Sequence, residues 1–123
     1  MTVRQLDHIN ITTNKLAETR QFFLDVLELE EGARPDFPFP GHWLYADGRA
    51  IVHRVGTDGD RVHGPEASLD HFALEATGYD ETLARLKDLS VEVFANDIEE
   101  LGLRQLFFND PNGVTIELDF RKG

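Results

Sequence analysis

The sequence contains no cysteine among its 123 residues. Disulfide bonds, thiolate catalysis and zinc sites built on sulfur are therefore excluded, and histidine, aspartate and glutamate remain as the strong metal ligands. Positive charge is also scarce, because 12 Lys and Arg side chains are outnumbered by 23 Asp and Glu side chains, for a net formal charge of −11. Such a chain repels phosphate backbones and anionic lipid surfaces, which argues against nucleic-acid and membrane partners.

Long hydrophobic runs are missing as well. Charged residues are scattered through positions 1–25, so the sequence predicts neither a signal peptide nor a membrane span. With 41% hydrophobic residues and no low-complexity segment, the chain has the size of one compact domain or of two small halves that share a core. These features predict a soluble, cytoplasmic protein.

One short pattern occurs twice in the sequence. Leu-Asp-His stands at residues 6–8 and again at residues 69–71, and each copy opens a stretch that alternates apolar and polar residues as a β-strand does. When the two copies are aligned, Glu18 falls on Glu81. The two halves of the chain are therefore predicted to be structural repeats.

Each half is predicted to form a strand, a helix and three further strands. In the first half the expected ranges are 6–12, 15–27, 28–36, 42–46 and 50–55. In the second half they are 69–76, 79–89, 91–96, 102–108 and 114–120. We therefore predict an α+β fold of two tandem βαβββ modules, 1–55 and 69–123, joined by a linker at 56–68. The modules are expected to form a cupped mixed β-sheet with the helices on its outer face.

The alternation along these strands decides which side chains face away from the helices. His8 and Asn10 are predicted to share that face of the first strand, and His71 the matching face of its repeat. Glu117 shares it in the last strand, and its counterpart in the first half is His53. An approximate twofold relation between the halves would bring the four ligand-type side chains together on one open sheet face.

The types of these side chains indicate a metal site. Two imidazoles and one carboxylate with open positions are the ligands of mononuclear Fe(II) oxygenases, and such donors also suit manganese, zinc, nickel and cobalt. The sequence therefore predicts a divalent-metal site at His8, His71 and Glu117. His53 is expected to be a fourth ligand or a donor close to the substrate.

Other polar residues are predicted to lie outside the site. Strand parity turns Asp7 and Asp70 away from the neighbouring histidines, which favours structural roles for both. His42 and His63 are expected to be exposed, in or beside loops.

Further residues are candidates for a substrate pocket. Aromatic side chains surround the proline-rich segment and either wall an apolar pocket or simply cover the sheet; they are Phe37, Phe39, Trp43 and Tyr45. In a later strand, Arg104 or Gln105 is expected to face the open side as a substrate-orienting donor, and Gln105 shares the parity of Phe107.

These features resemble the vicinal-oxygen-chelate superfamily, which includes glyoxalase I, extradiol ring-cleaving dioxygenases, fosfomycin-resistance enzymes and metal-free bleomycin-binding proteins. The resemblance rests on the paired βαβββ modules, a histidine in the first strand of each, and the ending FNDPNGVTIEL. Its Asp-Pro-x-Gly turn before a strand with Glu is specific to the superfamily but not to one member. The resemblance implies His8, His71 and Glu117 as metal ligands. Glyoxalase-type members add a fourth ligand, usually a carboxylate, where this chain has His53.

The resemblance leaves several functions open. An extradiol-dioxygenase-like enzyme acting on a small oxygen-rich substrate is favoured, and it would use Fe(II) or Mn(II) with His53 or Tyr45 as a base. A glyoxalase-type isomerase or lyase would instead use four protein ligands, with Glu117 as the base. Fosfomycin-type thiol transfer ranks third, because this acidic chain offers few clustered cations. The rival of a different class is a metal-free drug- or metabolite-binding protein, although such members normally lack the His/His/Glu set.

The resemblance also implies an assembly. Members of this length commonly form homodimers by exchanging modules, so that one site combines residues of two chains. Exposed edge strands and an open sheet face favour a dimer independently. We therefore expect a homodimer that binds a small-molecule substrate.

Overall fold

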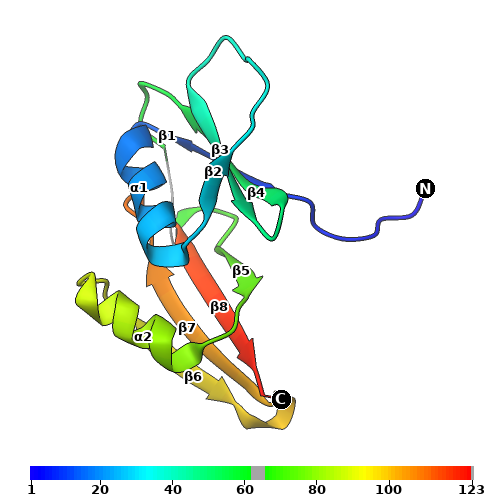
Figure 1. Ribbon diagram of the computed structural model, residues 1–123, viewed down its shortest axis with the longest axis vertical. Helices are drawn as coiled ribbons and strands as arrows, with labels where there is room; N and C mark the ends of the chain where they lie inside the picture. The colour runs from blue at the N-terminus through cyan, green and yellow to red at the C-terminus, as the bar shows by residue number, and fades with distance from the viewer. Residues whose placement is uncertain (62–65, 123) are drawn as a thin grey trace. The chain divides into compact units, whose positions relative to one another are not determined.

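The computed structural model describes residues 1–61 and 66–122. The chain divides into two compact units, residues 1–61 and 62–123, and each has its own helix and four-stranded sheet (Figure 1). The boundary between the units falls inside the predicted linker, and His63 lies outside the described residues.

The first unit contains one helix, α1 (Leu16–Leu27), and four strands. The strands are β1 (Ile9–Thr13), β2 (Glu30–Gly32), β3 (Gly41–Ala46) and β4 (Arg49–Gly56). Their order in the sheet is β1-β4-β3-β2, with β1 parallel to β4 and the other neighbours antiparallel. The predicted strand at 28–36 is reduced to β2, because the prolines of the following segment cannot donate to a strand ladder.

The second unit repeats this arrangement. Its elements are β5 (His71–Glu75), α2 (Tyr79–Asp88), β6 (Phe94–Ile98), a short 3₁₀ helix (Glu99–Leu101), β7 (Leu103–Asn109) and β8 (Thr115–Arg121). The sheet order is β5-β8-β7-β6, again with the first strand parallel to the last. The structure thus confirms the predicted α+β fold of tandem βαβββ modules. The cupped arrangement of the two sheets stays a prediction.

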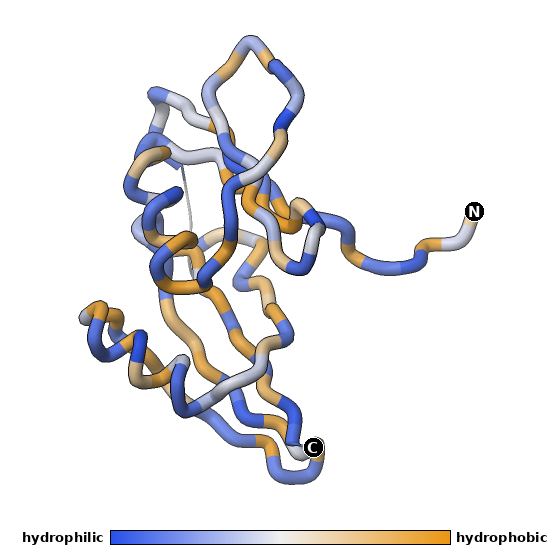
Figure 2. Tube along the Cα trace, viewed as in Figure 1, coloured by the Kyte–Doolittle hydropathy of each residue, from blue (hydrophilic) through white to orange (hydrophobic). Residues whose placement is uncertain are grey.

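The helices bury one side each. Thr19, Phe23 and Val26 of α1 are buried, at the spacing that places them on one face of a helix. Leu86 is the buried residue of α2, and hydrophobic segments alternate with hydrophilic ones along the chain (Figure 2). Truncation of a fully buried aromatic residue such as Phe23 to alanine costs about 3–5 kcal/mol of stability.

Neither helix resembles a membrane span. Across residues 1–61 and 66–122, the structure contains no helix that is both long enough and apolar enough to cross a bilayer.

The strand registers identify equivalent positions in the two units. Asn10 of β1 pairs with His53 of β4, and Ala73 of β5 pairs with Glu117 of β8. Asn10 and Ala73 each come two residues after the repeated histidine. His53 and Glu117 therefore occupy matching places in the two sheets, as the sequence repeat predicts.

Candidate functional site

Each repeated histidine contacts the aspartate that precedes it. Oδ2 of Asp7 lies 2.8 Å from Nδ1 of His8, and Oδ2 of Asp70 lies 2.8 Å from Nδ1 of His71. This corrects the expectation that both aspartates point away from their neighbours. That expectation assumed regular strands, but β1 begins only at Ile9 and β5 only at His71, so both aspartates precede the regular alternation.

The contact with aspartate determines which nitrogen of each imidazole remains available as a metal ligand. When Nδ1–H donates to the carboxylate, Nε2 keeps its lone pair, and histidines that bind metal ions are commonly held in this way. The hydrogen bond that Asp7 accepts from His8 lowers the pKa of Asp7, and the hydrogen bond that His71 donates to Asp70 raises the pKa of His71. Each unit therefore contains a histidine whose Nδ1 contacts the preceding aspartate.

In the second unit, His71 and Glu117 approach each other from adjacent strands. Nε2 of His71 lies 3.2 Å from Oε1 of Glu117, and Glu117 is only 8% exposed. Because Nδ1 of His71 already donates to Asp70, this contact requires a second proton, on Nε2 or on Glu117, or a cation between the two atoms. Two ligand atoms bound tetrahedrally at about 2.0–2.1 Å from a zinc ion are roughly 3.3 Å apart, so the donor atoms fit a shared metal ion.

Polar side chains of β6, β7 and β8 surround Glu117. Nε2 of Gln105 donates to Oε2 of Glu117 at 3.0 Å and lies 3.5 Å from Oδ1 of Asp119. Oε1 of Gln105 accepts a hydrogen bond from Asn96 at 2.8 Å. Burial raises the pKa of Glu117, and the neighbouring Asp119 raises it further. A cation at this place would favour the ionised form of both carboxyl groups.

The alternation of β7 separates Gln105 from Arg104. The guanidinium of Arg104 lies 3.6 Å from the ring centroid of Tyr79 in α2 and 3.4 Å from Oδ1 of Asp97. Of the two predicted donors, Gln105 therefore lies on the face of Glu117. Arg104 lies on the helix side of the sheet, outside the candidate site.

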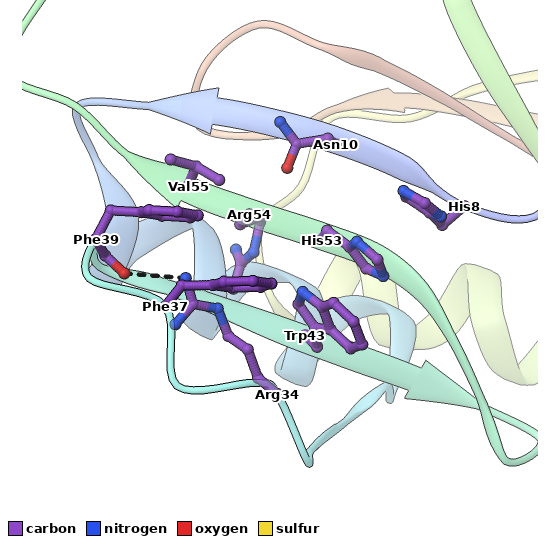
Figure 3. A pocket seen from close by; sticks show the side chains of 9 residues that line it. All are labelled: His8, Asn10, Arg34, Phe37, Phe39, Trp43, His53, Arg54 and Val55. Carbon is purple, nitrogen blue, oxygen red and sulfur yellow. Dashed lines mark hydrogen bonds between the residues drawn. The ribbon is translucent and has the colours of Figure 1, made fainter.

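In the first unit, His8, His53 and Trp43 form a stack of three rings (Figure 3). His53 is the middle ring, 3.8 Å from His8 with 17° between the ring planes, and 4.0 Å from Trp43 with 7°. A metal ion lies in the plane of each imidazole that binds it, because the nitrogen lone pair points along that plane. Two rings stacked nearly parallel cannot share one ion, so this geometry argues against His53 as a ligand beside His8.

The stack also affects the protonation of His53. Burial lowers the pKa of His53, and the neighbouring His8 lowers it further. His53 is therefore mostly neutral near pH 7 and can accept a proton.

An open cavity of about 350 Å³ adjoins the stack. The rings of Phe37 and Phe39 are parallel within 5° at 5.1 Å, and Phe37 lies 6.4 Å from Trp43, so they extend the aromatic surface. The cavity is lined by His8, Asn10, Arg34, Phe37, Phe39, Trp43, His53, Arg54 and Val55 (Figure 3). The sequence predicted no role for Arg34 and placed it in a strand at 28–36; in the structure Arg34 lies in an irregular segment after β2, directly before Pro35.

Tyr45 lies apart from this cavity. Its hydroxyl donates to the carbonyl of Ala33, and its ring covers Gly32 so closely that a Cβ there would lie 2.7 Å from the ring. The sequence grouped Tyr45 with the aromatic residues around the proline-rich segment, but the register between β3 and β4 shifts between Leu44 and Tyr45. The structure therefore leaves His53, and not Tyr45, as the candidate base in the cavity.

His42 differs from its predicted setting. It belongs to β3 and is half-buried rather than exposed in a loop, and Nε2 lies 3.9 Å from Oε2 of Glu31. Burial lowers the pKa of His42. It does not line the cavity.

The ligand-type side chains are distributed over both units. Within the described part of either unit, no three His, Asp or Glu side chains gather closely enough to hold a metal ion. Of the three predicted ligands, His8 belongs to the first unit, and His71 and Glu117 belong to the second.

Comparison with known proteins shows the family. Residues 5–118 match the model of the Glyoxalase/Bleomycin resistance protein/Dioxygenase superfamily, and the chain belongs to this superfamily. It is 26% identical over 121 residues to Glyoxylase I 4 of Arabidopsis thaliana. The aligned region covers 92% of this chain and 68% of that protein.

Solved structures share the fold. A glyoxylase/bleomycin resistance protein/dioxygenase domain from Frankia sp. EAN1pec matches with a TM-score of 0.81 and 16% identity, over 98% of this chain and 100% of that one. The fosfomycin resistance protein FosX from Listeria monocytogenes matches with a TM-score of 0.76 and 19% identity, over 98% and 96%. A mutant of FosX has been solved with Mn(II) and 1S,2S-dihydroxypropylphosphonic acid.

Proposed function

We propose that this protein is a divalent-metal-dependent enzyme that acts on a small oxygen-rich substrate, with His8, His71 and Glu117 as the metal ligands. The supporting observation is the Asp–His contact in each unit, which leaves Nε2 available, together with the 3.2 Å approach of His71 to Glu117. A bound divalent ion would supply Lewis-acid activation of one or two adjacent substrate oxygens. Iron, manganese, zinc, nickel and cobalt all accept these donors.

His53 is proposed as the acid–base group of the site. Stacking between His8 and Trp43 fixes its ring, and its lowered pKa leaves it neutral, so that it can take a proton from a substrate hydroxyl. The aromatic residues of the cavity would exclude water and orient the substrate. Gln105 would hold Glu117 in place through its hydrogen bond.

Three ligands and one base favour an extradiol-dioxygenase-like reaction. The likeness to Glyoxylase I 4 supports a second candidate, a glyoxalase-type isomerase or lyase. That chemistry would use four protein ligands with Glu117 as the base, and the ring stack of His53 is unfavourable for the fourth ligand. A metal-free binding protein is the alternative outside the enzymes.

A homodimer is part of the proposal. Each four-stranded sheet ends in two edge strands, β1 and β2 in the first unit and β5 and β6 in the second. Edge strands have unpaired backbone groups that a second copy of the chain can bind. Light scattering coupled to size-exclusion chromatography should give twice the mass of one chain.

Calorimetric titration of the EDTA-treated protein with Mn(II) and Zn(II) tests the ligand set. We expect the wild type to bind one ion per site and both His8→Ala and His71→Ala to lose most of this affinity. His42→Gln is the matched control, because His42 lies in β3 but outside the cavity. A wild type that binds neither ion would overturn the proposal in favour of the metal-free binding protein.

The reaction class is tested with the metal-loaded protein. Oxygen consumption with a panel of catechols would support the dioxygenase. Turnover of a hemithioacetal without oxygen consumption would support the isomerase or lyase instead.

A further inference from the structure

The cavity of the first unit contains a cation although the chain as a whole is acidic. The net formal charge of the protein is −11, and none of the described residues that line the cavity is Asp or Glu. Arg34 is the relevant cation, because Arg54 is fully buried with its guanidinium carbon 5.4 Å from the ring centroid of Phe23 in α1, and His53 is mostly neutral near pH 7. A cation beside a partly enclosed space attracts anions. The cavity therefore suits an anionic ligand.

Arg34 is positioned to bind such an anion. Nη2 of Arg34 donates to the carbonyl of Phe39 at 2.9 Å, and the guanidinium carbon lies 5.0 Å from the ring centroid of Phe37 and 5.1 Å from that of Phe39. These contacts hold the half-buried guanidinium in place without a carboxylate partner among residues 1–61. A guanidinium has five N–H donors in one plane, a geometry that matches a carboxylate.

Gly41 of β3 packs closely against its neighbouring strand and against Arg34. A Cβ at Gly41 would lie 2.3 Å from the backbone carbonyl oxygen of Arg54 and 2.9 Å from Nη2 of Arg34. The close approach of the β4 backbone requires glycine at this position, and the guanidinium of Arg34 also lies beside it.

The other walls of the cavity are mainly aromatic. His8, His53 and Trp43 form one stack, and Phe37 and Phe39 form a second that meets it at Trp43 (Figure 3). Arg34 lies at the Phe37–Phe39 end of this row, and His8 lies at the other end (Figure 3). Both faces of His53 are covered by its neighbours in the stack, so a planar ligand ring would contact the row edge-to-face, or stack on an outer face at the end of a stack. About 350 Å³ is enough space for one such ring.

We propose that the substrate is a planar aromatic carboxylate, with its ring against the aromatic row and its carboxylate bound by Arg34. This assignment rests on the proposed function and names its substrate class, because His8 belongs both to the ligand set and to the cavity. The end of the substrate that is distant from the carboxylate would then lie next to His8, where oxygen substituents on the ring would react.

Trp43 allows this proposal to be tested without turnover. It is the only tryptophan of the chain, so its fluorescence reports on the cavity. We expect benzoate to change the fluorescence of the EDTA-treated, full-length protein saturably. Benzamide lacks the charge and cyclohexanecarboxylate lacks the planar ring, so each should bind at least about 10-fold more weakly, as expected for the loss of one charged hydrogen bond or one stacked contact. Equal binding of all three compounds, or no saturable change with benzoate, would overturn the proposal.

Substitutions of Arg34 test its role in the same assay. Arg34→Gln should weaken benzoate binding by about 10-fold or more. Arg34→Lys keeps the charge but loses the planar donors, so its affinity for benzoate should lie between those of the wild type and of Arg34→Gln. Arg121→Gln removes one exposed positive charge from the second unit and should bind benzoate as the wild type does. Circular dichroism checks that each variant is folded. Unchanged binding by folded Arg34→Gln would contradict the assignment.

Repeating the titration with Mn(II) separates the two proposals. Benzoate binding without any Mn(II) binding would support the aromatic-anion cavity and overturn the metal-dependent enzyme. Mn(II) binding without any benzoate effect on Trp43 would overturn the substrate class and leave the ligand set intact.

Discussion

The two units have the same strands and the same Asp–His contact, but they differ where the last strand meets the first. The equivalent positions are occupied by His53 in the first unit and Glu117 in the second. His53 lies between two rings and its pKa is lowered. Glu117 lies among polar groups and its pKa is raised. The position of His53 is thus suited to an organic ligand that gives up a proton, and the position of Glu117 is suited to a cation.

The residues across the strand explain this difference. His53 pairs with Trp43, and Glu117 pairs with Phe107, so an aromatic ring is opposite in both units. The next pair on the same face is Gly41 with Val55 in the first unit, whereas it is Gln105 with Asp119 in the second. The pair two residues along the strands thus adds no polar group beside His53 but adds an amide and a carboxyl group beside Glu117.

The largest effects are expected for substitutions of Glu117 and His53, on metal affinity and on turnover respectively. Glu117→Gln should weaken Mn(II) binding by more than about 100-fold, beyond the 10–100-fold typical for residues that only orient ligands, because the amide removes the charged donor. His53→Gln should leave Mn(II) affinity unchanged but lower turnover by about 10²–10⁴-fold, the contribution of a general base. Calorimetry and steady-state rates measure the two effects. Equal losses of metal affinity would show that His53 is a ligand after all.

The two Asp–His contacts should be functionally equivalent although the units have diverged. Asp7→Asn and Asp70→Asn are each expected to weaken Mn(II) binding by about 10–100-fold, because the carboxylate orients the imidazole and raises its basicity. Asp88→Asn, at an exposed position of α2, is the control. A loss for only one of the two variants would mean that only one unit supplies a histidine to the metal.

Stability measurements compare the two faces of β7. Gln105→Ala removes the amide that donates to the buried Glu117 and should cost about 1–3 kcal/mol in urea-induced unfolding. Arg104→Ala removes a contact with Tyr79 on the opposite face and should cost less, about 0.5–1 kcal/mol. The reverse order would show that the polar network around Glu117 is not important for folding.

The smallest effect is a pH dependence of opposite sign in the two units. In EDTA-treated protein, His71 should titrate above 6.5 and His53 below it, from the directions in which their pKa values are shifted. The contribution of His71 to stability is therefore complete below pH 6.5 and is lost as the pH rises through its folded pKa. That of His53 is complete above pH 6.5 and is lost as the pH falls toward its folded pKa. Nuclear magnetic resonance titration of the imidazole protons checks both, and shifts of the same sign would contradict the comparison.

The fold was largely predictable because its signals are local. Each predicted strand and helix has a counterpart, and alternation placed Gln105 on the face of Glu117. Strand alternation gave the wrong orientation for Asp7 and Asp70, because both precede their regular strands. Proximity to the proline-rich segment did not bring Tyr45 into the cavity, because its hydroxyl donates to the carbonyl of Ala33.

Residue types and the two-residue period of a strand were enough to predict the repeat, the ligand-type residues and the equivalence of His53 with Glu117. The long-range contacts of the folded chain were needed to show that His53 stacks between two rings, that Tyr45 binds Ala33 instead of facing the cavity, and that Arg34 lines the cavity. The period of a strand predicts only the face on which a side chain lies. Ring stacking, register shifts and the path of a proline-rich segment depend on contacts between residues distant along the chain.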